Sequence, residues 1–168
     1  DPTRPVALAF AGYPSKNYIR AYAPLDVLGM NDYFGWFAGD TGQLINSAAL
    51  GPYLDRLRGL YPNKALFVTE FGAEGDRPGP ADEKGTYDFQ ADFMRFHLET
   101  YDQRRWLSGA IAWILQDFKV RPGWSGGNPV PDPPWVHKGL LDPNGNLKPV
   151  YGLTQQMYKQ TKPLVKPK

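Results

Sequence analysis

Cysteine is absent from this sequence, and histidine is scarce, with only 2 among 168 residues. The absence of cysteine excludes disulfide bonds, thiolate catalysis and cysteine-ligated metal sites. His97 and His137 lie far apart in the chain and lack the short spacing of paired metal ligands. The sequence therefore predicts neither a metal ion nor another cofactor.

An excess of one charge is also missing, because 19 Lys and Arg residues are balanced by 17 Asp and Glu residues. Such a chain has no basic surplus with which to bind nucleic acid or an anionic membrane surface. No apolar stretch reaches the roughly 18 residues that a membrane-spanning helix needs. The glycine-rich motifs GxGxxG and GxxxxGK, which bind nucleotides, do not occur either. We expect a soluble chain with no nucleic-acid or membrane partner.

Four short apolar runs predict an α/β domain with a parallel sheet. The runs are continuous rather than alternating, which is typical of parallel strands that are covered on both faces. Stretches with helical periodicity lie between them, and this order is typical of βα units. The runs are Val6–Phe10, Asp26–Asn31, Ala65–Glu70 and Gly109–Leu115.

Three helices are expected between and after these runs. Leu50, Leu54 and Leu57 share one helical face, which ends at Gly59. A second helix, from about residue 87 to residue 107, carries an aromatic stripe that predicts core packing, with His97 half-buried beside it. A third helix covers about residues 151–161, and a Lys- and Pro-rich tail, 163–168, is expected to be frayed. The long irregular segment 121–134 is of a kind that is either functional or disordered.

The residues at which each apolar run stops are informative, because ligands of parallel α/β folds bind beyond the carboxyl ends of the strands. Glu70 closes the third run and is followed by Phe71 and Gly72, a pattern that strand propensity and surface exposure explain poorly. Tyr33, placed likewise after the second run, can donate a hydrogen bond that orients such a carboxylate. On the residues alone, a solvated acid and a packed tyrosine remain the alternatives.

Large aromatic residues also gather at or beyond the strand ends, where their faces can stack on sugar rings. The pattern suggests a carbohydrate site, although some of these side chains must serve packing. They are Trp36, Phe37, Trp113, Trp124 and Trp135.

Five blocks of sequence form a recognisable series: DPTRPV (1–6), DVLGMNDYFGWF (26–37), FVTEFGAE (67–74), WILQDF (113–118) and KGLL to KP (138–149). In this order they resemble the catalytic domain of glycoside hydrolase family 2, which includes β-galactosidases, β-glucuronidases and β-mannosidases. The resemblance covers nearly the whole chain. It implies a TIM (β/α)8 barrel that hydrolyses glycosidic bonds with retention of configuration, using two glutamates and carbohydrate substrates.

The resemblance implies roles for six residues. Glu70 matches the catalytic nucleophile of the family, and Tyr33 matches the tyrosine that contacts the nucleophile. Trp113 matches an aromatic floor beneath the reacting sugar. The other three match positions in or near the sugar-binding pocket and are Asn31, Trp36 and Lys138.

The chain departs from the family in two respects. Val136 stands where the family commonly has an asparagine, two residues before the matched lysine. A full barrel takes about 250 residues, and the family's acid/base glutamate follows an asparagine just before the block that begins at Asp1, whereas this chain contains no Asn-Glu pair. We therefore expect residues 1–162 to form the second half of the barrel, strands five to eight, with the nucleophile but without its acid/base partner.

The leading hypothesis is a fragment of a retaining β-glycosidase that is inactive alone and is either completed by the missing half or covered by self-association. One alternative is a non-catalytic half-barrel that binds carbohydrate or serves a structural role. Another is a complete enzyme with a different acid, for which the candidates are Glu74, Asp76 and Asp117. We expect Glu74 and Asp76 to be solvated and Asp117 to be a structural hydrogen-bond acceptor.

Overall fold

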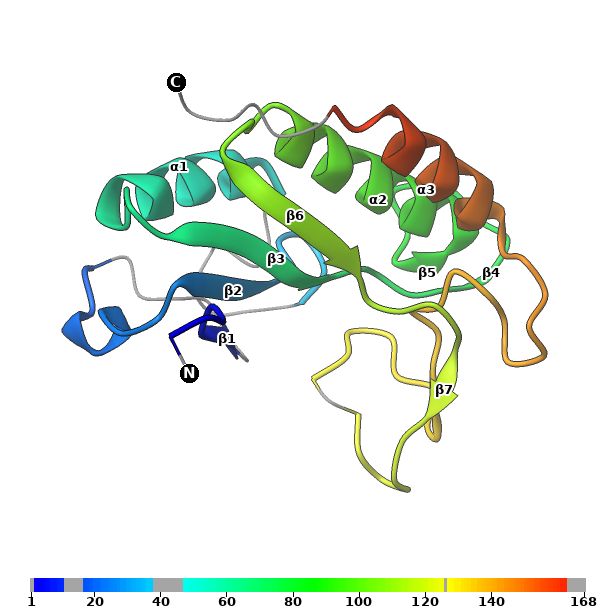
Figure 1. Ribbon diagram of the computed structural model, residues 1–168. Helices are drawn as coiled ribbons and strands as arrows, with labels where there is room; N and C mark the ends of the chain where they lie inside the picture. Colours follow the sequence, from blue (N-terminus) through cyan, green and yellow to red (C-terminus); the bar gives the residue numbers. More distant parts are fainter. Residues whose placement is uncertain (1, 11–16, 38–46, 126, 163–168) are drawn as a thin grey trace.

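A sheet of four parallel strands forms the centre of the fold (Figure 1). The computed structural model describes residues 2–10, 17–37, 47–125 and 127–162, so the expected tail 163–168 lies outside the described residues. The strand order is β1-β2-β3-β6, and the prediction of an α/β domain with a parallel sheet is confirmed. The strands are β1 (Ala7–Phe10), β2 (Val27–Asp32), β3 (Ala65–Phe71) and β6 (Leu107–Ala112).

Two short strand pairs lie beyond the main sheet. β4 (Gly75–Arg77) pairs with β5 (Gly85–Thr86) in parallel, and β7 (Phe118–Lys119) pairs with β8 (Trp135–Val136) in the antiparallel sense. The described part of segment 121–134 connects β7 to β8 and contains neither helix nor strand, as its composition predicts.

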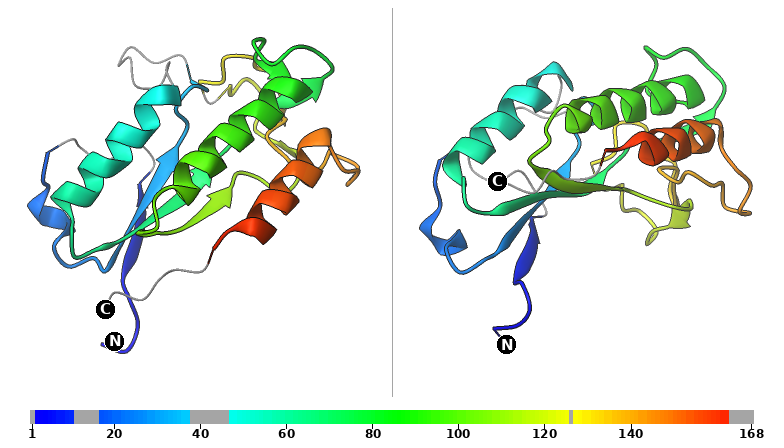
Figure 2. Two further views of the ribbon diagram at one scale, coloured as in Figure 1. Left: turned by 90° about the horizontal axis from the view of Figure 1, so that it is seen from above. Right: turned by 45° about the horizontal axis from the view of Figure 1, so that its top comes forward.

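Three α-helices lie together on one face of the main sheet, as the two views in Figure 2 show. They are α1 (Leu50–Leu60), α2 (Tyr87–Asp102) and α3 (Pro149–Gln160), and single 3₁₀ turns occupy Arg20–Tyr22 and Ser47–Ala49. α2 begins where the Thr86 side chain accepts a hydrogen bond from the Phe89 N–H. It ends earlier than expected, because Leu107 belongs to β6. Among the described residues, no helix is both long and apolar enough to cross a membrane.

The core fills the space between the helices and the sheet. Side chains that alternate along β2 and β3 point toward the helices, and all of them are buried. They meet the apolar faces of α1 and α2, so the helical periodicity of the sequence corresponds to real packing. The sheet contributes Leu28, Met30, Leu66 and Val68, and the helices contribute Leu50, Leu54, Leu57, Phe93, Met94 and Leu98.

An irregularity in β3 sets the direction of the side chains at its carboxyl end. β2 and β3 pair in step as far as Met30 and Val68, after which Asn31 lies opposite Glu70. Thr69 is therefore an extra residue in β3. Because side chains alternate with period two along a strand, one extra residue reverses the face on which the following side chains lie.

The reversal places Phe71 in the core and leaves Glu70 on the face away from the helices. Phe71 is fully buried and contacts the rings of His97 and Tyr101, which lie on α2. His97 is also completely buried, its ring stacked on Phe93 with 3.8 Å between centroids, so the expectation that it is half-buried is wrong. Its role in packing is as expected.

The expectation that all four strands are covered on both faces is wrong for β1 and β6. In β1 Leu8 is 48% exposed, and in β6 Ile111 is 52% exposed. Ala110 and Ala112 pair with buried residues of β3, so Ile111, which lies between them, points to the face that carries no helix. The described residues thus leave apolar surface open along both edge strands.

We expect this open surface to drive self-association of the chain. Light scattering on a dilute sample measures it, and Ile111→Lys should raise the monomer fraction, because a charge on the open face opposes apolar contact. Leu147→Lys is the matched control, since Leu147 is 65% exposed but lies outside the sheet. A well-folded, strictly monomeric wild-type chain that unfolds cooperatively would contradict this expectation.

Candidate active site

A cavity of about 360 Å³ lies at the carboxyl ends of β2, β3 and β6, the end at which parallel α/β folds bind ligands. Five of the six residues that the resemblance implies line it, namely Asn31, Tyr33, Glu70, Trp113 and Lys138. The chain therefore brings together side chains from widely separated parts of the sequence. The other lining residues are Phe37, Glu74, Phe118, Trp124, Ser125, Asn128 and Val136.

Glu70 and Tyr33 are in direct contact. The Tyr33 hydroxyl donates a hydrogen bond to Glu70 Oε2 over 2.7 Å, which is the contact that the sequence predicts. The neighbouring Thr69 hydroxyl donates to Asn31 Oδ1 over 2.8 Å and fixes the Asn31 side chain at the cavity wall. The register shift in β3 brings Glu70 opposite Asn31 and onto the same face of the sheet.

Lys138 is almost completely buried, and its ammonium lies over aromatic rings. Lys138 Nζ is 4.1 Å from the ring centroid of Tyr33, 4.7 Å from that of Phe37 and 5.7 Å from that of Trp36. Burial lowers the pKa of Lys138 to about 8, although the carboxylates of Glu74 and Glu70 oppose the shift. The cavity thus places a poorly solvated cation between two acidic side chains.

Glu74 is a member of the site that the sequence analysis placed in solvent. It is only 1% exposed, and Asn128 Nδ2 donates a hydrogen bond to its Oε1. Burial raises the pKa of Glu74 to about 7, despite the opposing charges of Lys138 and His137. The expectation of a solvated residue is therefore wrong.

The glycines on either side of Glu74, Gly72 and Gly75, are the feature of the sequence that could have predicted its burial. A Cβ at Gly72 would lie 2.2 Å from the Trp113 carbonyl oxygen, and one at Gly75 would lie 2.5 Å from Gln90 Oε1. The backbone on either side of Glu74 thus runs against Trp113, just beyond β6, and against α2, and this close packing leaves the Glu74 side chain inside the fold.

Trp36 does not reach the cavity, so its expected place in the sugar pocket is wrong. The side chain is completely buried, packs against Phe89 at 5.9 Å between ring centroids, and faces Lys84 and Lys138. Trp135 is likewise absent from the lining, with Lys119 lying 4.8 Å above its ring. The aromatic side chains available to a ligand here are those of Phe37, Trp113, Phe118 and Trp124, together with Tyr33.

Asp117 holds the segment that carries Lys138. Its carboxylate accepts hydrogen bonds from the Gly139 N–H at 2.7 Å, Lys148 Nζ at 3.1 Å and His137 Nδ1 at 3.1 Å. The expectation of a structural acceptor is confirmed. Asp76, by contrast, lies near the surface and forms an ion pair with Arg77 at 3.0 Å, as expected of a solvated residue.

One trio among the described residues has the composition of a metal site: ligand atoms of Asp76, Asp132 and His137 lie within 4.8 Å of one another. Both ring nitrogens of His137 are hydrogen-bonded to carboxylates, those of Asp117 and Asp132. The Asp117 hydrogen bond raises the pKa of His137 to about 9, which favours a protonated ring paired with the two carboxylates. His137 forms an ion pair with Asp132, and Asp76 forms one with Arg77.

Residues 123–127 read Gly-Trp-Ser-Gly-Gly and fit GxSxG, the motif that surrounds the nucleophile of many serine hydrolases, with Ser125 at its centre. A nucleophile elbow places its serine on a sharp turn from strand to helix. Ser125 lies instead in the irregular connection between β7 and β8. The ring nitrogens of His137 are bonded to carboxylates and those of His97 are buried, so neither described histidine is placed as its base.

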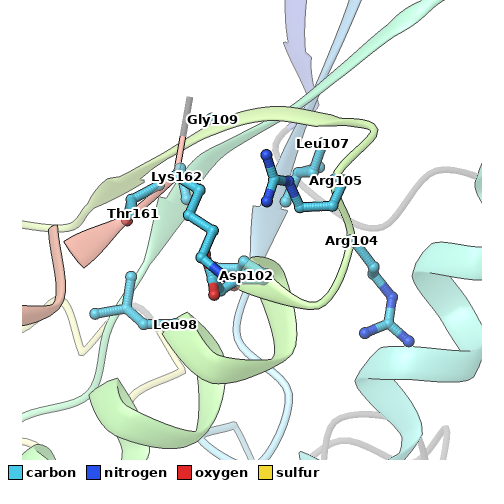
Figure 3. Close-up of a pocket in the computed structure, with 10 residues that line it drawn as sticks. Leu98, Asp102, Arg104, Arg105, Leu107, Gly109, Thr161 and Lys162 are labelled. Carbon is cyan, nitrogen blue, oxygen red and sulfur yellow. The ribbon is translucent and has the colours of Figure 1, made fainter. Parts of the chain in front are cut away.

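A second, smaller cavity of about 70 Å³ lies at the C-terminal ends of α2 and α3 (Figure 3). Arg104 at its rim turns toward α1, where it donates two hydrogen bonds to the carboxylate of Asp55 at 2.9 and 2.8 Å. None of the predicted site residues lies here.

No protein-family model and no curated protein matches the chain. Solved structures do match. A glycoside hydrolase family 2 β-galacturonidase from Eisenbergiella tayi bound to galacturonate has a TM-score of 0.79 at 23% identity, over 98% of this chain and 29% of that one. The β-glucuronidase of Ruminococcus gnavus has a TM-score of 0.74 at 19% identity, over 94% of this chain and 26% of that one. A Bifidobacterium dentium β-glucuronidase, complexed with coumarin-3-O-glucuronide, has a TM-score of 0.64 at 25% identity, over 80% and 21%.

The chain has the fold of one part of these glycoside hydrolases. It spans about a quarter of their length. The resemblance that the sequence motifs indicate therefore extends to the three-dimensional arrangement of strands and helices.

The stability of the fold should depend on the protonation of Glu74. Its pKa is about 7 in the folded chain against an ordinary 4.5, so the unfolded chain releases the proton first as pH rises, and stability falls until pH passes 7. Glu74→Gln removes this loss. Urea unfolding at pH 5 and pH 8 should show the variant gaining at least about 1 kcal/mol on wild type between the two values. Glu83→Gln, at an exposed position, is the control, and a pH-independent difference for Glu74→Gln would contradict the burial argument.

Proposed function

We propose that this chain carries the nucleophile of a retaining β-glycosidase of glycoside hydrolase family 2 and corresponds to strands five to eight of its TIM barrel. The observation that supports this most is the Glu70 carboxylate held by Tyr33 in a cavity with aromatic walls at the carboxyl ends of parallel strands. The shared fold with part of known β-glycosidases supports it as well.

The proposed reaction has two steps. Glu70 attacks the anomeric carbon as the glycosidic C–O bond breaks, and the leaving oxygen takes a proton from an acid, which forms a glycosyl ester. Water, deprotonated by the same group, then attacks the anomeric carbon and releases Glu70. Tyr33 orients the nucleophile, while Asn31, Trp113 and Lys138 hold the sugar.

The acid/base group is proposed to lie outside this chain, since a retaining enzyme needs two carboxyl groups about 5 to 5.5 Å apart. Of the three acids weighed as substitutes, Asp117 is fully occupied by hydrogen bonds and Asp76 forms an ion pair away from the cavity. Glu74 alone of these lines the cavity. Glu74→Gln therefore tests whether the chain supplies an acid of its own.

The sugar is proposed to carry a carboxylate. Lys138 is the one cationic side chain among the described residues that line the cavity. The structural neighbours described above are named as glucuronidases and a galacturonidase, and two of them hold a uronic acid or its glycoside, galacturonate and coumarin-3-O-glucuronide. A uronoside, a glycoside of a uronic acid, therefore agrees with the cation in the cavity and with the names of the structural neighbours.

A 2-fluoro glycosyl fluoride reagent should label Glu70, because it forms the glycosyl ester without needing an acid for its leaving group. Mass spectrometry of peptides locates the label, and 2-fluoro-glucuronosyl fluoride should react faster than its 2-fluoro-glucosyl counterpart. Glu70→Gln should abolish labelling, whereas Asp92→Asn, at an exposed position on α2, should not. Saccharide binding in a calorimeter without any labelled peptide would favour the non-catalytic alternative, and a label elsewhere would refute the assignment of Glu70.

The chain alone should not hydrolyse ordinary glycosides, because help from a general acid is typically worth about 10² to 10⁴-fold. Dinitrophenyl glycosides need little protonation and should be cleaved slowly by the wild-type chain but not by Glu70→Gln. Robust turnover of an alkyl glycoside, measured by sugar release, would show that an acid is present in this chain. If Glu74→Gln then abolished only the alkyl glycoside activity, Glu74 would be that acid.

A further inference from the structure

Tyr33 contacts two side chains of opposite charge, one through its hydroxyl and one through its ring. Its hydroxyl donates to the Glu70 carboxylate at 2.7 Å, and its ring faces the Lys138 ammonium at 4.1 Å from the centroid. The tyrosine thus lies between the proposed nucleophile and a buried cation.

We propose that Lys138 is a positioning residue that acts on Glu70 through Tyr33. A cation over the face of a phenol ring draws π electrons toward itself. The hydroxyl proton becomes more positive as a result, and the hydrogen bond to Glu70 becomes stronger. The catalytic meaning of this effect rests on the proposed function of Glu70, but the effect itself does not.

The contacts of Lys138 favour this arrangement over a simple buried ion pair. Within the described part of the chain, Lys138 Nζ has no hydrogen bond and no carboxylate oxygen within 4.0 Å, whereas three aromatic rings lie close to it. The acidic groups that act on its charge from the neighbouring elements are Glu70, in β3, and Glu74, in the loop that follows. The nearest partner of the ammonium is therefore the ring of Tyr33.

The backbone around Lys138 is held firmly enough to keep the ammonium there. The Lys138 carbonyl accepts a hydrogen bond from the Ile114 N–H at 3.2 Å, just beyond β6. On one side, Lys148 Nζ donates to the His137 carbonyl at 2.8 Å, and on the other the Gly139 N–H donates to Asp117 at 2.7 Å. The position of Lys138 is thus set by contacts that do not involve Tyr33.

The inference is tested by NMR on the whole chain with ¹³Cζ-labelled tyrosine, the Tyr33 signal being identified by its loss in Tyr33→Phe. In Lys138→Met at pH 6.5 this signal should move upfield, away from the phenolate position, because the hydroxyl donates more weakly. Lys138→Arg keeps a cation over the ring and should keep the wild-type position. The signal of Tyr53, which is buried elsewhere in the core, should stay unchanged and reports that the fold is intact.

Titration separates Lys138 from Glu74. The wild-type Tyr33 signal should shift upfield as pH rises through about 8, where Lys138 loses its proton. The shift should be absent in Lys138→Met and Lys138→Arg. It should persist in Glu74→Gln, at a lower pH, because the Glu74 carboxylate no longer opposes the effect of burial on Lys138. An unchanged Tyr33 signal in Lys138→Met, or a shift lost only in Glu74→Gln, would overturn the inference.

Labelling kinetics then distinguish positioning from sugar binding. If Lys138 acts through Tyr33, Lys138→Met should lower the maximal rate of Glu70 labelling by about tenfold, and Lys138→Arg should restore it. A residue that only binds sugar would change the reagent concentration needed for half-maximal rate instead, and that result alone would overturn the inference. Failure of wild type to label at all would refute the proposed function while leaving the NMR result to decide the contact.

Discussion

The single extra residue in β3 is the constraint on which the site depends. If β3 paired regularly, with Thr69 opposite Asn31, the alternation would turn Glu70 toward α2 and the core, where an ionised carboxylate is costly, and would turn Phe71 toward the open face. With the extra residue, the same strand supplies apolar packing to the helices and a carboxylate to the cavity. The Thr69 hydroxyl is used as well, because it holds the Asn31 amide beside that carboxylate.

Charge in the cavity is balanced over short distances rather than by solvent. Lys138 is buried among rings, Glu74 is buried beside it, and each shifts the pKa of the other toward the charged form against the effect of burial. Neither residue can be changed alone without altering the other. A similar group of charges lies next to the cavity. Asp117 accepts hydrogen bonds from Lys148 and His137 and thereby fixes the backbone that bears Lys138.

Much of the fold and part of the site follow from local sequence. Apolar runs and leucine spacing predict β2, β3 and α1 to within a residue or two, and the strand-end position of Glu70 and Tyr33 predicts their contact. The wrong predictions concern burial and have one physical origin, because the burial of a side chain depends on residues that are distant in sequence and close in the fold. Trp36 follows a strand end but is covered by Phe89, and Glu74 lies in a glycine-rich loop but is drawn inward by close backbone packing. Likewise, continuous apolar character in β6 does not reveal that only one of its faces meets a helix.

The order of strands in the main sheet has a consequence for the time course of folding. Each strand pairs with the next one along the sheet in chain order, β1 with β2, β2 with β3 and β3 with β6, and a helix joins each of the last two pairs. Each of these parallel pairings closes a long loop, since Ala7 pairs with Val27, Val27 with Ala65 and Leu66 with Leu107, and such non-local pairing slows folding. The cavity also requires Lys138, which lines it, and Lys148, which binds the neighbouring His137 carbonyl. Both residues follow the long β7–β8 connection, and the chain must fold back to the end of β6 to place them. Both the sheet and the pocket thus depend on contacts between distant parts of the chain, and we expect the chain to fold slowly for its size.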